Sequence, residues 1–189
     1  MPDSRPVLNP LAATALAAAC VPMSVLPMAN IDFPPELWHL TPLFAVGLLL
    51  GRGLTGWAAV MTVLAVRLTA DLGIWAVTGN ADWAFYGTSQ LFVYGGLVVS
   101  PLIGRAMRNH RPATLLGSAL AAPVAFYLVS NFGVAMGDPS RTVARVYVDG
   151  LPFLRNSLIA TPVWAGILFS PPVLASLCVS RPTERAVSA

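Results

Sequence analysis

The chain has 189 residues, of which 56% are hydrophobic and only 10% are charged, with a net charge of +3. Its mean hydropathy is +0.71. Soluble domains carry about 25% charged residues, so this chain has too few charges to cover a globular surface, and its apolar composition equally excludes disorder. The basic residues form no stripe, so no nucleic-acid partner is expected. What remains is a bundle of helices embedded in a lipid bilayer.

Six apolar segments approach the roughly 20 residues that a helix needs to cross about 30 Å of hydrocarbon. They predict an all-α integral membrane bundle of six transmembrane helices, a single domain over residues 1–189. The expected helices are residues 7–28, 40–52, 54–77, 83–103, 113–136 and 154–179. The first segment has an alternative interpretation as a signal peptide, but its apolar run is long and its end is a poor cleavage site.

The arginines set the expected orientation, because cytoplasmic loops of membrane proteins carry an excess of basic residues. The connection over residues 105–111 is short and holds three arginines, so we place it in the cytoplasm. Six crossings then leave seven arginines inside and three outside (Arg141, Arg145 and Arg155). This pattern predicts a multi-pass protein of the bacterial cytoplasmic (inner) membrane with both termini in the cytoplasm.

Two charged residues, Arg67 and Asp71, stand inside the third segment. A charge near the bilayer centre costs about 2.5–3.5 kcal/mol. The two residues are four positions apart and share a helical face, so pairing offsets much of that cost. Two interpretations stay open: an ion pair that locks the helix into the bundle, or a charged pair that lines a cavity for substrate or protons.

Further polar residues are expected in the outer half of the bundle. Asn131 in the fifth segment has an amide that needs partners in another helix or in a ligand. Arg155 and Asn156 form a polar cluster near the start of the sixth segment. Together with Asp71, these residues are predicted to converge on one site. The alternative interpretation is that their hydrogen bonds only join neighbouring helices.

Aromatic residues near segment ends are typical of interfacial belts. Trp38 and Trp83 also flank the two short outer loops, so with Tyr86 they are the predicted apolar walls of the site. The long connection over residues 137–152 has arginines and an aspartate at a spacing of four, which predicts a short amphipathic helix on the outer surface. Such a helix is either a plain interfacial helix or a lid.

Small residues recur in the first segment, where Ala13 and Ala17 form a small-xxx-small pair. Such pairs let helix backbones approach closely. They predict close packing either within the bundle or against a partner protein.

Enzymatic and metal-binding signatures are missing from the sequence. It has no GxxxxGK[ST], HExxH or GxSxG motif. The sequence therefore gives no sign of a P-loop for ATP, of a zinc protease or of the nucleophile elbow of a serine hydrolase. His39 and His110 fall on opposite predicted sides of the membrane and cannot share a metal. We therefore expect no catalytic residues, no metal and no cofactor.

Four stretches carry a family resemblance. Residues 39–45 (HLTPLFA) resemble NFTPVAA, and residues 71–73 (DLG) resemble part of SDLILG. Residues 130–134 (SNFGV) resemble TNFGVW, and residues 151–158 (LPFLRNSL) resemble IPFFRNTLLGD. These motifs match a family of small bacterial integral membrane proteins of unknown function, itself similar to the S components of energy-coupling factor (ECF) transporters.

The chain departs from that pattern at two places. His39 stands where the pattern has Asn, and Ala160-Thr161-Pro162 replaces the acidic residue expected after the sixth-helix motif.

The resemblance implies a substrate-capturing subunit with six helices. S components bind a vitamin or metal ion from outside and use small residues of their first helix to dock on a transmembrane coupling protein, whose ATPase subunits supply energy. It implies a docking role for Ala13 and Ala17.

The first hypothesis is therefore a transport protein that captures a small polar solute from the outer side, with Arg67 balancing Asp71. The alternative is a structural or accessory subunit that packs against a larger membrane complex. An intramembrane enzyme ranks last, because no nucleophile–base pair is visible.

Overall fold

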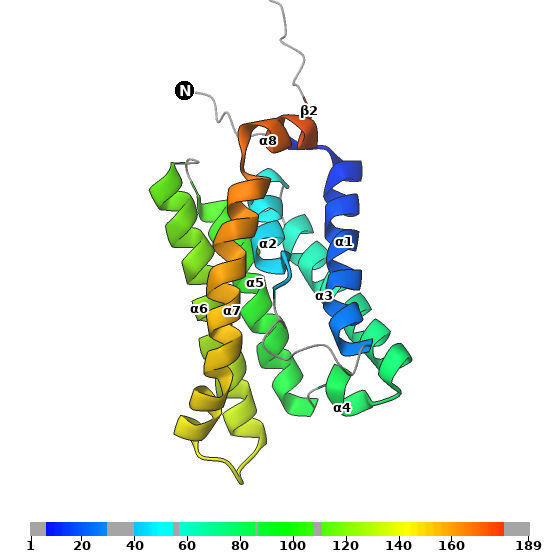
Figure 1. The fold of residues 1–189 in the computed structure, drawn as a ribbon, viewed down its shortest axis with the longest axis vertical. Coiled ribbons are helices and arrows are strands. Elements are labelled where there is room, and N and C mark those ends of the chain that lie inside the picture. The colour runs from blue at the N-terminus through cyan, green and yellow to red at the C-terminus, as the bar shows by residue number, and fades with distance from the viewer. Residues whose placement is uncertain (1–6, 30–39, 55–56, 86, 108–110, 180–189) are drawn as a thin grey trace, which may run out of the picture.

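The computed structural model describes residues 7–29, 40–54, 57–85, 87–107 and 111–179. In these ranges helices make up the chain apart from their connecting turns and one short pair of strands, which confirms the all-α class (Figure 1). The long helices run alternately down and up the long axis of the molecule: α1 (Pro10–Ala29), α2 (Leu43–Gly53), α3 (Ala58–Thr78), α5 (Gln90–Ala106), α6 (Pro112–Gly137) and α7 (Val143–Leu168). The short elements are β1 (Val7–Leu8), α4 (Ala81–Ala84), η2 (Gly87–Ser89), α8 (Pro171–Leu177) and β2 (Cys178–Val179).

Three helices of the described part of the chain, α1, α3 and α6, are long and apolar enough to cross a membrane. α7 and α8 form a fourth candidate if this pair, bent by 69°, counts as one span. α2 has only 11 residues, which at about 1.5 Å per residue covers roughly half of the hydrocarbon layer. Three or four candidate spans thus stand where the sequence predicted six transmembrane helices.

The fourth predicted helix begins later than expected. Trp83 lies in the separate short helix α4, and α5 starts only at Gln90. Gly79 and Gly87 bracket this segment with φ angles of 67° and 55°, a left-handed conformation that costs glycine little. The turn at Gly87 breaks the apolar run that looked continuous from residue 83, and the turn at Gly79 separates α4 from α3.

α7 begins well before the predicted start at residue 154. The hydroxyl of Thr142 caps it by accepting a hydrogen bond from the Arg145 amide at 3.3 Å. Pro152 lies inside the helix and does not end it. The short surface helix or lid expected within residues 137–152 is therefore wrong as a separate element, because most of it is the first part of α7.

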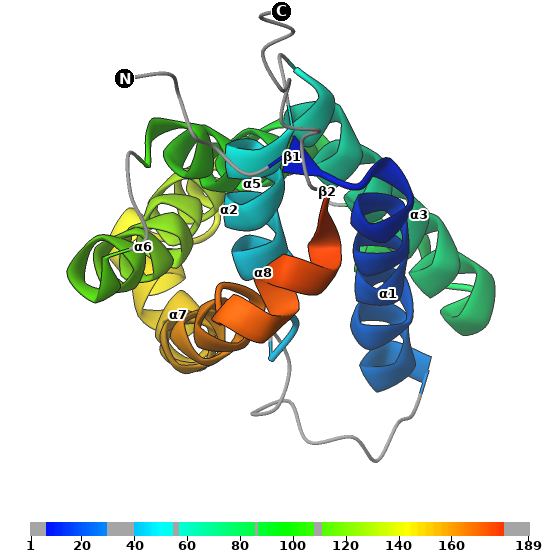
Figure 2. The ribbon, with the colours of Figure 1, turned by 90° about the horizontal axis from the view of Figure 1, so that it is seen from above.

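The sixth predicted helix also ends early. α7 stops at Leu168, and α8 leaves at an angle across the end of the bundle (Figures 1 and 2). The reason is the Pro171-Pro172 pair, since proline has no backbone N–H and disfavours a helical residue before it. Pro171 instead occupies the first turn of α8, where proline is tolerated.

α2 is the central helix of the fold. Every residue from Leu43 to Arg52 is buried, and its main partner is α5. Glycines make the contact close: a Cβ atom added to Gly51 would overlap the backbone of Pro101, and one added to Gly104 would overlap the backbone of Leu48. Such backbone-to-backbone packing is how helices associate in membranes.

The two ends of the described chain meet at the end of the bundle where α2 finishes. β1 pairs antiparallel with β2, with Leu8 opposite Cys178. The Asn9 amide donates to the Leu177 carbonyl at 2.8 Å, and the Leu8 side chain packs against Gly53. This strand pair joins α1 to α8 (Figure 2). The start of α1 therefore lies at the same end of the bundle as the end of α7.

Candidate solute-binding cavity

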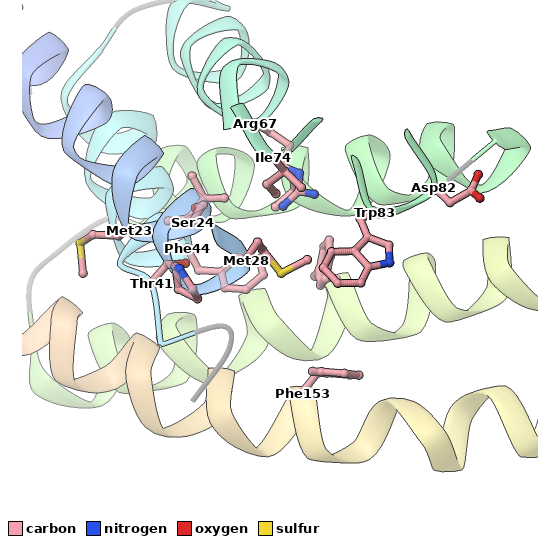
Figure 3. A pocket seen from close by; sticks show the side chains of 14 residues that line it. Met23, Ser24, Met28, Thr41, Phe44, Arg67, Ile74, Asp82, Trp83 and Phe153 are labelled. Atoms are coloured by element: carbon pink, nitrogen blue, oxygen red, sulfur yellow. The ribbon is translucent and has the colours of Figure 1, made fainter. Parts of the chain in front are cut away.

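Among the described residues, no helix continues the line of the 11-residue α2 through the other half of the bundle. A cavity of about 490 Å³ lies there, at the amino end of α2, within the 300–1,000 Å³ typical of small-molecule sites. Figure 3 shows the side chains that line it: Met23, Ser24, Pro27, Met28, Thr41, Leu43, Phe44, Arg67, Ile74, Asp82, Trp83, Leu97, Phe126 and Phe153. They come from α1, α2, α3, α4, α5, α6 and α7, together with Thr41 just before α2.

Most of this lining is apolar. Met23 and Met28 come from the last turns of α1, and Phe44 and Phe126 contact each other with ring centroids 5.2 Å apart. In Figure 3 Arg67 enters from α3 on one side and Phe153 from α7 on the other. Flexible methionines and aromatic rings of this kind accept large apolar ligands.

The Arg67–Asp71 pair lies beside the cavity and joins α3 to α5. Arg67 Nη2 lies 2.5 Å from Asp71 Oδ1. The other carboxylate oxygen accepts hydrogen bonds from Gln90 Nε2 at 3.1 Å and from the Tyr94 hydroxyl at 2.9 Å. The Asp71 side chain is fully buried, whereas that of Arg67 is 15% exposed. These contacts fix the position of Asp71 and, through it, that of Arg67.

A second cavity of about 270 Å³ adjoins the first. The two share Arg67, Phe126 and Phe153 in their linings, so these three side chains form the boundary between them. The wall of the second cavity includes the polar side chains of Ser130, Asn131, Arg141, Asp149 and Ser157.

The outer edge of the second cavity is held by ion pairs. Arg141 Nη2 lies 2.5 Å from Asp149 Oδ2, and Arg145 Nε lies 3.0 Å from Asp149 Oδ1. These residues belong to the loop after α6 and to the first turns of α7, at the end of the bundle where α6 finishes and α7 begins (Figure 1).

The structure brings only some of the predicted site residues to the cavities. Arg67 lines both cavities, Trp83 lines the first and Asn131 lines the second. The amide nitrogen of Asn131 also donates to the Tyr127 carbonyl at 2.8 Å. Asp71 lines neither cavity, so it lies behind Arg67 and not on the cavity surface.

The predicted pair Arg155 and Asn156 does not join this site. Arg155 is exposed and lines a separate groove on α7 with Leu151 and Ile159. Asn156 is 4% exposed and lines none of the three hollows described. Ser157, the next residue, is the one that reaches the second cavity.

The predicted docking residues also lie inward. Ala13 and Ala17 are 5% and 3% exposed and belong to the hydrophobic core, so the chain's own helices occupy their face in this structure. Trp38 and Tyr86 lie outside the described residues.

Gln90 and Tyr94 are polar partners of Asp71 that the sequence analysis missed. They are four positions apart on α5 and both donate to Asp71. Two polar residues on one face of a predicted membrane helix are the signal that would have found them. Among the described residues, no group of three or more His, Cys, Asp or Glu side chains is placed to hold a metal ion.

Apolar helices around an internal cavity, with an ion pair buried beside it, are compatible with a multi-pass membrane protein. Residues 5–181 match the model of a family described as a family of unknown function (DUF6580), and the chain belongs to that family. No curated protein and no solved structure matches the chain. The similarity to ECF S components therefore stays a prediction.

Proposed function

We propose that this protein is a solute-binding subunit of a membrane transport system, similar to an ECF S component. The observation that carries the proposal is the cavity of about 490 Å³ left by the half-length α2, with Arg67 in its wall. A subunit that only packs against a larger complex needs no such space, and a pocket-free bundle was the structure expected for it.

The proposed topology has six crossings of the cytoplasmic membrane, of which the 11-residue α2 is the shortest. Three features support it. The long helices alternate in direction, β1 and β2 place both described ends together, and Arg52, Arg105 and Arg111 fall at or near that end (Figure 1). By the positive-inside rule that end faces the cytoplasm, and the cavities lie toward the outer side.

Blocking the cavity tests the proposal. Ile74 is 3% exposed and lines the cavity, whereas Leu72 on the same helix is 45% exposed. We expect Ile74→Trp to remove a small molecule that the wild type and Leu72→Trp both retain. The proteins are purified into nanodiscs, incubated with a bacterial metabolite extract and washed, and the retained compounds are identified by mass spectrometry.

Two results would contradict the proposal. One is that the wild type and Leu72→Trp retain no compound beyond those found with empty nanodiscs. The other is that Ile74→Trp, eluting as a monodisperse protein, retains the same compound equally well. Copurifying ATPase subunits would support transport, whereas a fixed-ratio respiratory complex would favour the structural alternative.

A further inference from the structure

We propose that the ligand of the cavity is an organic anion with an apolar body, whose anionic group lies at Arg67. This inference rests on the proposed solute-binding function and names the chemical class of the solute. It departs from the small polar solute expected from the sequence.

The arrangement of the ion pair presents its positive side to the ligand. Arg67 lines both cavities, whereas its partner Asp71 lines neither and is 0% exposed. Both oxygens of Asp71 face protein groups, namely Arg67 on one and the Gln90 amide and Tyr94 hydroxyl on the other. A molecule in either cavity therefore meets a guanidinium and not a carboxylate at this point.

Among the described residues, the other charge in the lining of the first cavity stands at its rim. Asp82 is the acidic residue in its described lining, and it stands on an exposed position of α4 at the rim. α2 starts at the cavity, and its N-cap residue Pro42 makes no side-chain cap, so the partial positive charge of the helix end adds to that of Arg67. The groups described at this point therefore favour an anionic ligand over a cationic one.

The apolar lining sets the rest of the ligand. Met28, Phe44, Trp83, Phe126 and Phe153 surround the space below Arg67. A small hydrophilic ion would leave these side chains facing its hydration shell, whereas an aromatic or branched apolar body would replace water on them. In surroundings of such low polarity, one guanidinium–carboxylate contact is stronger than in water.

A matched set of probes separates charge from shape. The probes are 1-naphthylacetate, its neutral amide 1-naphthylacetamide and the cation 1-naphthylmethylammonium, measured by equilibrium dialysis against the protein in zwitterionic nanodiscs. We expect the anion to bind the wild type about tenfold or more tightly than the amide, because it adds a charge-assisted hydrogen bond. The ammonium ion is expected to bind weakest.

Variants assign this preference to Arg67. Arg67→Gln is expected to bind the anion and the amide within about twofold of each other, whereas Arg67→Lys keeps the preference because it keeps the charge. Arg155→Gln removes an arginine from the separate groove on α7 and is the matched control, expected to behave as the wild type. A monodisperse elution profile shows that each variant is folded.

Three results would overturn the inference. Equal binding of all three probes would show that the site has no preference for anions. Tighter binding of the ammonium ion would show that it prefers cations. Failure of the wild type to bind any probe would also reject this ligand class. In each case the proposed function stands or falls separately, on the compounds retained from the metabolite extract.

Discussion

The two halves of the bundle are packed by opposite means. Around α2, glycines bring helix backbones together, so that Gly51 and Gly104 leave no room for a Cβ atom. Around the amino end of α2, long side chains such as Met28, Trp83 and Phe153 surround about 490 Å³ of space. Most of the same helices run through both halves, so the difference arises from the side chains and from where α2 begins.

This difference separates the residues that hold the helices together from the residues that line the cavity. Van der Waals packing and hydrogen bonds drive helix association in a membrane, since lipid is as apolar as the helix surfaces. The half with glycine contacts therefore holds the bundle together, and the half with the cavity gives up packing contacts. A substitution that adds volume is expected to have opposite effects in the two halves.

The largest effect is expected where a methyl group is added in the packed half. Gly104→Ala places a Cβ atom against the backbone of Leu48, which has little freedom to move. We expect the free energy of unfolding to fall by about 3 kcal/mol, the upper part of the usual range for overpacking. The measurement is reversible unfolding of the protein in mixed detergent and SDS micelles.

Gly95→Ala is the matched control for this loss. Gly95 lies on the same helix, and a Cβ atom added there would meet nothing within 4 Å. Alanine is the better helix former by about 1 kcal/mol, so this variant is expected to equal or exceed the wild type. Similar losses in the two variants would show that the helix contact between α2 and α5 is not the cause.

A smaller effect of opposite sign is expected in the half with the cavity. Ser24 lines the cavity, and its hydroxyl donates to the Cys20 carbonyl one turn earlier at 2.9 Å. Ser24→Leu fills part of the space with apolar atoms, so we expect a gain of about 1 kcal/mol in the free energy of unfolding. The same unfolding measurement applies, together with weaker retention of the solute.

Thr14 provides the control at an exposed position of α1 that does not line the cavity. It is exposed, and its hydroxyl makes the same bond to the carbonyl four residues earlier, that of Pro10, at 2.9 Å. Thr14→Leu is expected to leave solute retention unchanged. If Ser24→Leu is as damaging as Gly104→Ala, the contrast between the two halves does not hold.

Much of the half around α2, where glycines bring the helices together, could be predicted from the sequence. The long apolar runs predicted α1, α3 and α6 to within a few residues, because uninterrupted spans leave little choice of boundary. The small-xxx-small rule that singled out Ala13 and Ala17 applies equally to Gly47 and Gly51, whose close contact with α5 the sequence analysis passed over.

The cavity half was harder to predict. The pair Arg67–Asp71 followed from its spacing, and the structure forms it. Which of its members lines the cavities did not follow, because that depends on the partners that α5 supplies to Asp71. Arg155 was placed in the site from a helix start at residue 154, and moving that start to Val143 puts the residue in mid-helix on an exposed face.

The smallest effect is expected at the outer tip of the cavity half, where the loop after α6 turns. The Ser140 hydroxyl donates to Asp138 Oδ1 at 2.5 Å and the Ser140 amide donates to the same atom at 3.0 Å. These bonds hold the pKa of Asp138 below its ordinary value. Ser140→Ala removes the hydroxyl bond alone, so we expect the pKa to rise part of the way back.

The sign of the pH dependence follows from that direction. A carboxylate with a lowered pKa in the folded state adds stability above its unfolded pKa, and this is lost as the pH falls through the folded pKa. The wild type is therefore expected to be slightly more stable than Ser140→Ala near pH 7, with the difference vanishing once Asp138 is protonated in both. A difference that persists unchanged in acid would show that the hydroxyl acts on the turn and not on the charge.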